Sequence, residues 1–333
     1  MKIWFPAIRA GSGTDVFTKR LAAALEKRGI PATITWLPHH AEYAPWLVAK
    51  PKPPTGVTVM HCNSWLHERM MPAGIPMVVT IHHSVHDTAL QPYKNPLQRL
   101  YHQHWIRRLE ATAIDRADRV TAVSRYTATQ AIEVFGCNDI STIYNWVDPQ
   151  VFHPPKRQQP GDPFRLLFVG NLSRRKGADL LPAIMRHLGD RFVLHYTGSQ
   201  HDFGRDVRLP SNMVALGHLE GTEALVEAYQ HHDALLFPTR LEGFGLSAIE
   251  AQACGLPVIS THSSSIPEVV EDGKTALLCP LDDVAAFADA ARRLQKEPTL
   301  WLRMSEAASQ RAKLFSENIA LTRYINIYRK LTA

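Results

Sequence analysis

The stretch FPTRLEGFGLSAIEAQACGLP, residues 237–257, decides how the rest of this sequence is interpreted. A short apolar run ends at Pro238, a Gly-Phe-Gly turn follows, and a helix of mostly small residues is expected from about Leu246. Gly243 and Gly245 allow positive φ angles and a close approach of the backbone to a ligand, and the N-terminus of the helix favours an anion there. The pattern therefore predicts a phosphate-binding turn after a buried strand.

Two carboxylates accompany this turn. Glu250 stands one turn into a helix that is otherwise uncharged, and Glu242 directly precedes the glycines. A carboxylate inside a packed helix requires a partner, and sugar hydroxyls are suitable donors. In the alternative, Glu250 only complements the helix dipole and Glu242 is a solvated loop residue. These residues alone leave both interpretations open.

The two glutamates form an E-x7-E element within EGFGLSAIEAQACGLPVIS, and IPEVVEDGKTALL follows at residues 266–278. In this order the motifs resemble those of retaining glycosyltransferases of family 4, over most of the chain. The resemblance implies the α/β GT-B fold, in which two doubly wound Rossmann-like domains face each other across a cleft. It also implies transfer of a hexose from a nucleotide diphosphate sugar to an acceptor hydroxyl, in bacterial-type glycan, polysaccharide or glycolipid biosynthesis.

Length and composition agree with two globular domains. The 333 residues divide naturally into two domains of about 150 residues, and 45% of them are apolar. The apolar stretch at the N-terminus is too short for a signal peptide, and no run approaches the roughly 18 apolar residues of a membrane span. Four cysteines without a C-x-x-C pair suggest neither a zinc site nor a disulfide framework. We therefore expect a cytoplasmic protein.

The sequence PPKRQQPGDP, residues 154–163, contains four prolines and a glycine among polar residues, which is typical of a linker. It separates an expected acceptor-binding domain, residues 1–155, from a nucleotide-sugar-binding domain, residues 156–314. A last helix within residues 315–333 is expected to cross back to the N-terminal domain, as in the family.

Apolar runs separated by helical spacers predict two sets of parallel strands. They lie at residues 2–8, 32–37, 57–61, 77–82, 119–123 and 140–144 before the linker, and at residues 165–169, 191–196, 213–216, 234–237, 257–260 and 276–279 after it. Ligands of doubly wound sheets bind at the carboxyl ends of the strands.

The sequence FVGNLSRRKGADLL, residues 168–181, is a strand followed by a loop with three successive cations. Such cations can neutralise a diphosphate, although a solvated basic loop has the same pattern. The resemblance implies that Lys176 grips the donor phosphates and that Gly170 and Asn171 belong to the donor site. Asn171 stands where the family usually has arginine, so Arg175 is our choice for the second cation.

The resemblance also implies roles for residues near the N-terminus. The Gly11-Ser12-Gly13 turn is similar to the glycine-rich loop of the family, which places Gly13 close to the donor. His82, at the end of a predicted strand, matches a histidine that faces the reacting end of the donor sugar. A structural role for His82 is the alternative.

The complete set of expected catalytic residues is therefore His82, Arg175, Lys176 and Glu242. The resemblance further implies that Glu250 accepts hydrogen bonds from ribose hydroxyls. Donor binding is expected to involve Gly13, Gly170, Asn171, Gly243, Phe244, Gly245, Leu246 and Glu250.

No cofactor and no metal are expected. His102 and His104 are two residues apart on a predicted helix and cannot share a face, and the sequence has no Asp-x-Asp element. Glu268 follows a serine run where the family often has glycines. We expect it to secure its loop, and the serines to lie near the donor.

The expected partners are a nucleotide-sugar donor and a carbohydrate or lipid-linked acceptor. Residues 93–108, YKNPLQRLYHQHWIRR, mix aromatic, aliphatic and basic side chains. They either contact an anionic membrane at its inner face or form an amphipathic helix packed on its own sheet. Nucleic acid is not expected, because no pattern of nucleic-acid recognition is present.

Two other functions remain open from the sequence. The same fold serves other enzymes, such as sugar-nucleotide epimerases and phosphorylases. The chain can also be an inactive subunit that binds a sugar nucleotide for a second enzyme, since Asn171 and Trp146 depart from the family motifs.

Overall fold

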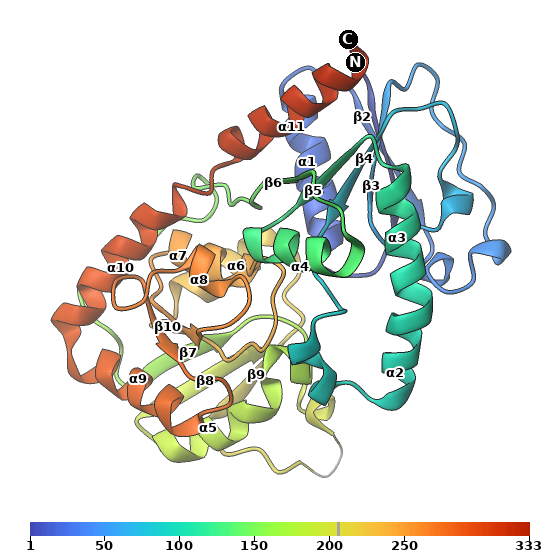
Figure 1. Ribbon diagram of the computed structural model, residues 1–333. Coiled ribbons are helices and arrows are strands. Elements are labelled where there is room, and N and C mark those ends of the chain that lie inside the picture. The colour runs from blue at the N-terminus through green and yellow to red at the C-terminus, as the bar shows by residue number, and fades with distance from the viewer. Residues whose placement is uncertain (205–206) are drawn as a thin grey trace. The chain divides into compact units, whose positions relative to one another are not determined.

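The computed structural model describes residues 1–204 and 207–333, and the chain divides into two compact units. Unit 1 comprises Met1–Asn145 and Glu317–Ala333, and unit 2 comprises Trp146–Ser316. Each unit is an α/β sandwich in which helices cover both faces of one sheet (Figure 1).

The first boundary lies earlier than the proline-rich segment suggested. Residues 146–155 belong to unit 2, because Val147 forms a β-bridge with Ser316 and the ring of Phe152 packs 6.3 Å from that of Tyr229. The observed division, between Asn145 and Trp146, therefore falls before the expected break after residue 155.

The sheet of unit 1 has six parallel strands in the order β2-β1-β3-β4-β5-β6. The strands are β1 (Ile3–Ile8), β2 (Ala32–Leu37), β3 (Val59–Asn63), β4 (Met77–Ile81), β5 (Arg119–Ala122) and β6 (Ile140–Thr142). The α-helices are α1 (Gly13–Lys27), α2 (Pro96–Leu100), α3 (Arg107–Arg116), α4 (Arg125–Phe135) and α11 (Glu317–Thr332), and other helical segments include η2 (Pro45–Leu47) and η5 (Tyr101–Ile106).

The sheet of unit 2 also has six parallel strands, in the order β12-β11-β10-β7-β8-β9. The strands are β7 (Phe164–Phe168), β8 (Phe192–Thr197), β9 (Met213–Gly217), β10 (Ala234–Phe237), β11 (Val258–Thr261) and β12 (Ala276–Cys279). The helices include η6 (Arg174–Lys176), α5 (Leu181–Leu188), α6 (Gly221–Gln230), α7 (Leu246–Ala253), α8 (Ile266–Val269), α9 (Val284–Lys296) and α10 (Pro298–Ala312).

Both sheets confirm the expected α/β class. Strands β10 and β11 are buried along their whole length, since helices cover both faces of a parallel sheet. In each unit the strand order reverses beside the first strand, between β1 and β3 in unit 1 and between β7 and β10 in unit 2. Such switch points are where doubly wound sheets bind ligands.

Helix α11 closes unit 1 by packing on α1 and β3 (Figure 1). Its Tyr328 hydroxyl lies 2.6 Å from Nδ1 of His61 on β3, and Nε2 of His61 lies 2.7 Å from Oγ1 of Thr80 on β4. Thr80 continues the chain to Thr121, 2.7 Å away, whose hydroxyl donates to the carbonyl of Val79.

This chain of hydrogen bonds fixes the state of the histidine. If Thr121 donates to a carbonyl, Thr80 donates to Thr121, so Nε2 of His61 carries the proton and Nδ1 accepts from Tyr328. Burial lowers the pKa of His61 to about 3, which keeps the ring neutral, as this arrangement requires.

Among the helices within the described ranges, none combines the length and the apolar character needed to cross a lipid bilayer.

The network predicts the effect of Tyr328→Phe. The change removes the donor and leaves Nδ1 of the buried His61 without its partner, which costs about 1 to 3 kcal/mol. Urea unfolding should show this loss, whereas Tyr43→Phe, at a side chain that is 52% exposed, should change the free energy of unfolding little. Equal stability of both variants would show that the His61–Tyr328 bond does not hold α11.

Candidate active site

The main cluster of charged residues lies at the switch point of unit 2. The loops after β7 and β10 leave adjacent strands at their carboxyl ends, so side chains from both loops meet there. The first loop carries the three cations of η6, and the second carries Glu242 and the glycine turn.

The two loops are packed against each other through their backbones. The amide of Arg240 donates to the carbonyl of Arg175 over 2.9 Å. Gly177 has φ +70°, and a Cβ at this position would lie 1.9 Å from the carbonyl oxygen of Pro238. Only glycine therefore fits here, which explains the glycine that ends the Arg-Lys-Gly sequence.

Arg240 adds a side-chain link between the loops. Its guanidinium, with 4% of the side chain exposed, lies 2.6 Å from Asp179 and 2.7 Å from Asp282, and it also bonds the carbonyl of Arg174. Because the planar guanidinium offers five donors in a fixed geometry, one residue holds three segments in register. Arg240 lies within residues 237–257, but no sequence pattern singled it out.

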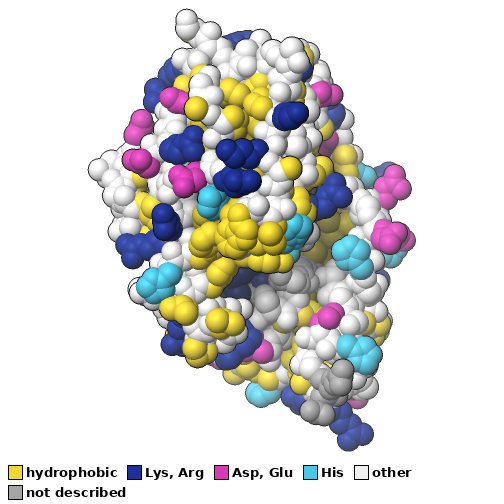
Figure 2. Space-filling view, turned by 90° about the vertical axis from the view of Figure 1, so that its right-hand side faces the viewer, with side chains coloured by type: hydrophobic (Ala, Val, Ile, Leu, Met, Phe, Trp, Pro, Cys, Tyr) yellow, Lys and Arg dark blue, Asp and Glu magenta, His cyan; other side chains and the backbone are white. Residues whose placement is uncertain are grey.

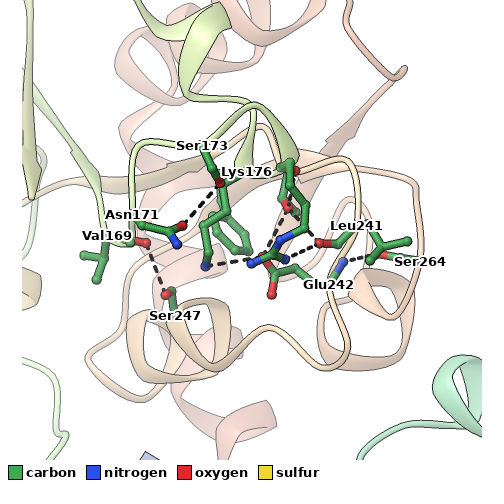
Figure 3. A network of polar contacts seen from close by, with 12 residues as sticks. Val169, Asn171, Ser173, Lys176, Leu241, Glu242, Ser247 and Ser264 are labelled. Carbon is green, nitrogen blue, oxygen red and sulfur yellow. Dashed lines mark hydrogen bonds and ion pairs between the residues drawn. The ribbon is translucent and has the colours of Figure 1, made fainter. Parts of the chain in front are cut away.

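Glu242 lies at the centre of the cluster (Figure 3). Its Oε1 lies 3.3 Å from Nζ of Lys176 and 3.4 Å from Nη1 of Arg175, and it accepts a hydrogen bond from Oγ1 of Thr239 over 3.2 Å. Burial by itself raises the pKa of the Glu242 carboxyl, but the charges of Lys176 and Arg175 outweigh it, so the pKa lies below its ordinary value. Glu242 is thus a buried carboxylate between two cations.

Lys176 reaches this position across Gly170. Its Nζ lies 5.2 Å from the centre of the Phe237 ring, and a Cβ on Gly170 would lie 2.9 Å from Cδ of the lysine. Gly170 has φ +142°, a region that other residues rarely adopt. Glycine at position 170 therefore leaves space for the lysine side chain.

Asn171 is exposed, and its side-chain oxygen accepts a hydrogen bond from Ser173 over 3.2 Å (Figure 3). Figure 3 shows its side chain on the same loop as Lys176. In this structure its contact is local to the loop.

The serine run before Glu268 holds the backbone of Glu242. Ser264 accepts a hydrogen bond from the amide of Glu242, and the Ser265 hydroxyl donates to its carbonyl, both over 2.9 Å. The backbone of Glu268 is itself held by Arg311, whose Nη2 donates to its carbonyl over 2.8 Å. The serines were expected to lie near a donor; in this structure Ser264 and Ser265 hold the loop that carries Glu242.

The glycine turn starts helix α7. Gly245 has φ +97° at the N-cap of α7, and the Ser247 hydroxyl donates to the carbonyl of Val169 after β7 over 3.3 Å. Phe244 is buried, with its ring 5.6 Å from that of Phe315. The first turn of α7, including Leu246, therefore starts beside the cationic loop, where its N–H groups favour an anion.

Glu250 lies in α7 with 5% of its surface exposed, and its Oε2 accepts a hydrogen bond from the hydroxyl of Tyr229 over 3.2 Å. Burial, and then the Glu250 charge, raise the pKa of Tyr229, so the phenol stays protonated and donates. Tyr229, on α6, is a partner that the sequence did not reveal, because the hydrogen bond joins residues of two different helices.

In unit 1, His82 follows β4 and lines a small pocket at the carboxyl ends of β1 and β3, together with Thr14 and Phe17 of α1. The rings of His82 and Phe17 meet edge to face, 4.7 Å apart. Burial, with smaller effects of His83 and His61, lowers the pKa of His82 to about 3, so its imidazole is neutral at neutral pH. His61 also lines this pocket, so the pocket adjoins the hydrogen-bond network of His61 and Tyr328.

Gly13 is the first residue of α1, and the turn before it is held by Asp15. The carboxylate accepts hydrogen bonds from the amides of Ala10 and Gly11, over 3.3 and 2.9 Å. An aspartate in the first turn of a helix after a glycine pair is a recognisable signal, and our sequence analysis missed it. Near His82 in the sequence, His86 has a structural contact, because its Nε2 lies 2.8 Å from Oε2 of Glu110.

Within residues 1–204 and 207–333, no three His, Cys, Asp or Glu side chains are placed to hold a metal ion.

Sequence comparison identifies the family. Residues 163–297 match the family described as Glycosyl transferases group 1, and residues 37–151 match Glycosyltransferase Family 4. Together the two matches cover more than half of the chain. The chain belongs to glycosyltransferase family 4.

Two curated relatives illustrate the similarity. D-inositol 3-phosphate glycosyltransferase 1 of Catenulispora acidiphila is 28% identical over 313 residues, which cover 83% of this chain and 73% of the relative. Glycogen synthase of Mycobacterium tuberculosis is 30% identical over 269 residues, which cover 76% of this chain and 64% of the relative. This family 4 chain thus spans less than two thirds of the length of the second relative.

Solved structures show the same fold. Sucrose-phosphate synthase from Thermosynechococcus elongatus superimposes with a TM-score of 0.79 at 18% identity, over 99% of both chains. HepE of Anabaena, solved in complex with UDP-glucose, gives a TM-score of 0.75 at 16% identity, also over 99% of both chains. The expected GT-B fold is confirmed.

The ion cluster predicts a pH-dependent effect of Glu242→Gln. The change leaves Lys176 and Arg175 beside each other without a counter-charge, so unit 2 should lose about 1 to 3 kcal/mol at pH 7. Because the pKa of Glu242 is lowered on folding, its contribution is complete above the ordinary pKa and disappears as the pH falls through the lowered value. Urea unfolding of wild type and variant should therefore converge at acidic pH, and a pH-independent difference would contradict the ion pairing. The exposed Glu306→Gln is the control.

Proposed function

We propose that this family 4 chain is a retaining glycosyltransferase that moves a hexose from a nucleoside diphosphate sugar to an acceptor hydroxyl without a metal ion. The observation that carries the proposal is the Lys176–Glu242–Arg175 cluster, with its buried carboxylate, at the switch point of unit 2. Family membership, and a structural neighbour solved with UDP-glucose, support a nucleotide-sugar donor. Retention of configuration is taken from the family resemblance.

The charges of the cluster suit a diphosphate leaving group. Two cations and one carboxylate leave one positive charge in excess, and the first turn of α7 adds the partial charge of its N–H groups. In the reaction the bond between the anomeric carbon and the diphosphate breaks, a bond to the acceptor oxygen forms, and the acceptor proton is released. Negative charge grows on the diphosphate, so fixed positive groups stabilise the transition state more than the ground state.

Four other roles follow from the same proposal. Glu242, with the backbone of Phe244 and Gly245, is assigned to the sugar, and Glu250 to the ribose. Gly13 and Gly170 are assigned to the close approach of the donor phosphates. His82 can act as a hydrogen-bond partner of the donor sugar but not as a cation near pH 7, since its pKa is about 3.

The acceptor is proposed to be a carbohydrate or a lipid-linked sugar, in bacterial-type glycan or glycolipid synthesis. An inactive sugar-nucleotide-binding subunit would bind the donor equally well, and an epimerase would return an isomerised nucleotide sugar. Slow hydrolysis of UDP-glucose without acceptor, with free glucose as product, separates the transferase from both.

The ribose assignment predicts that Glu250→Gln weakens UDP binding. Loss of one or two charge-assisted hydrogen bonds costs about 1 to 3 kcal/mol, roughly a 5- to 150-fold increase in Kd. Glutamine can still accept from Tyr229, so the fold should survive, and thermal unfolding checks this. Calorimetry with UDP measures Kd, with Glu306→Gln as the control, and an unchanged Kd would remove Glu250 from the site.

The charge assignment predicts that turnover depends on Lys176 and survives chelation. Removing one donor from a preorganised anion site costs about 10² to 10³ in rate, so Lys176→Ala should lose most of its kcat. Arg174→Ala is the matched control, because this neighbouring cation has 65% of its side chain exposed and should keep near wild-type turnover. Activity that is abolished by EDTA and restored by magnesium would contradict the metal-independent mechanism, as would a Lys176→Ala enzyme within a few-fold of wild type.

A further inference from the structure

Two segments of unit 1 that are far apart in sequence lie side by side. The hydroxyl of Tyr101 donates to Oε1 of Glu42 over 2.9 Å, and the indole N–H of Trp105 donates to the Glu42 carbonyl over 2.8 Å. The rings of Trp46 and Trp105 meet 6.2 Å apart. The segment from Glu42 to Trp46 therefore lies against η5, which follows directly on α2 in the chain.

This surface is unusually apolar. Among the described residues, five of the six most exposed large hydrophobic side chains belong to it. Figure 2 shows hydrophobic side chains gathered on the face that carries α2 and α3, with basic side chains and histidines around them. We call these five residues the Trp46 patch: Tyr43 (52% exposed), Trp46 (60%), Leu47 (72%), Leu97 (75%) and Leu100 (57%).

The fold does not bury this patch although it buries the residues next to it. Further along the same helical segment, Ile106 and Leu109 pack with Val85 in a small core, which is the packed amphipathic helix expected as one alternative. Leu97 and Leu100 are three residues apart on α2, so they share one face, and that face is exposed. Only the second half of the segment is therefore explained by packing on its own unit.

The charge around the patch is strongly positive. Residues 38–52 and 94–108 contain six Lys or Arg and a single acid, Glu42, which is bonded to Tyr101. One of the six, Lys94, is buried and donates to the carbonyl of Val85. The other five are exposed: Lys50, Lys52, Arg99, Arg107 and Arg108.

We propose that the Trp46 patch docks this chain on the surface of an anionic lipid bilayer. Tryptophan, tyrosine and leucine side chains enter the boundary between head groups and acyl chains, and each nearby Lys or Arg adds about 1 kcal/mol at an anionic surface. A second copy of the chain fits less well, because a symmetric contact would bring together two surfaces with the same excess of positive charge. Anionic lipid satisfies both the apolar side chains and the cations.

Vesicle sedimentation with the full chain tests the proposal. The wild type should bind vesicles of phosphatidylglycerol and phosphatidylcholine, bind phosphatidylcholine alone weakly, and be released by salt. The double variant Leu47→Glu with Leu97→Glu should bind anionic vesicles about tenfold or more weakly, since it loses two apolar contacts and gains two negative charges. The matched control is Leu314→Glu with Ile319→Glu, at side chains that are 63% and 49% exposed outside the patch.

Equal binding of the two double variants, or no binding of the wild type to anionic vesicles, would overturn the proposal. Light scattering without lipid tests whether a second copy of the chain occupies the patch instead. A dimer of the wild type that is abolished by Leu47→Glu with Leu97→Glu would assign the patch to a second copy. Thermal unfolding of both double variants shows whether each remains folded. None of these measurements depends on the proposed transferase activity.

Discussion

Burial of the Glu242 carboxylate is the constraint on which the architecture of unit 2 depends. A buried charge is stable only when it is paired, and both of its cationic partners come from the loop after the neighbouring strand β7. The two loops must therefore lie in contact, which leaves no space for a Cβ on Gly177 and little on Gly170. Arg240 and the serine run add further ion pairs and hydrogen bonds that hold the same loops. The strand order β10-β7 makes all of this possible, because it places the two loops at one edge of the sheet.

The sequence was sufficient to predict the fold because the strands follow simple rules. Within the described residues, each of the twelve strands overlaps one of the predicted runs, and the central strands β4, β10 and β11 are buried throughout because helices cover both faces of a parallel sheet. The observed boundary precedes the expected break after residue 155 for a different reason. The prolines of the linker are more conspicuous than Val147 and Phe152, and burial of these two residues in unit 2 is a tertiary effect that local sequence does not record.

The candidate site was predictable in its motifs but not in its supports. Lys176, Arg175 and Glu242 were named from the sequence, and the structure brings these three together. Their contacts with each other could not be predicted, since they depend on the packing of two loops separated by more than sixty residues. Two supporting residues belong to no recognised motif: Tyr229, which lies beside Glu250, and Arg240, which lies between the loops. Any residue of the right shape and hydrogen-bonding capacity at these positions would serve. Asp15 is different: its place in the first turn of α1 was visible in the sequence.

The ion cluster also bears on how the site could meet an anionic substrate. Glu242 supplies the counter-charge beside Lys176 and Arg175, while the glycines and Arg240 fix the backbone around them. A diphosphate arriving at the cations would then find donors that are already oriented, and little reorganisation would accompany the growth of charge on the leaving group. The carboxylate would remain beside the new anion, and this repulsion favours a bound state in which Glu242 turns to a neutral partner such as a sugar hydroxyl. If the proposed donor binds at this cluster, its phosphates would take over the cations before the glutamate is released to the sugar, so the same pairing would set the order of events.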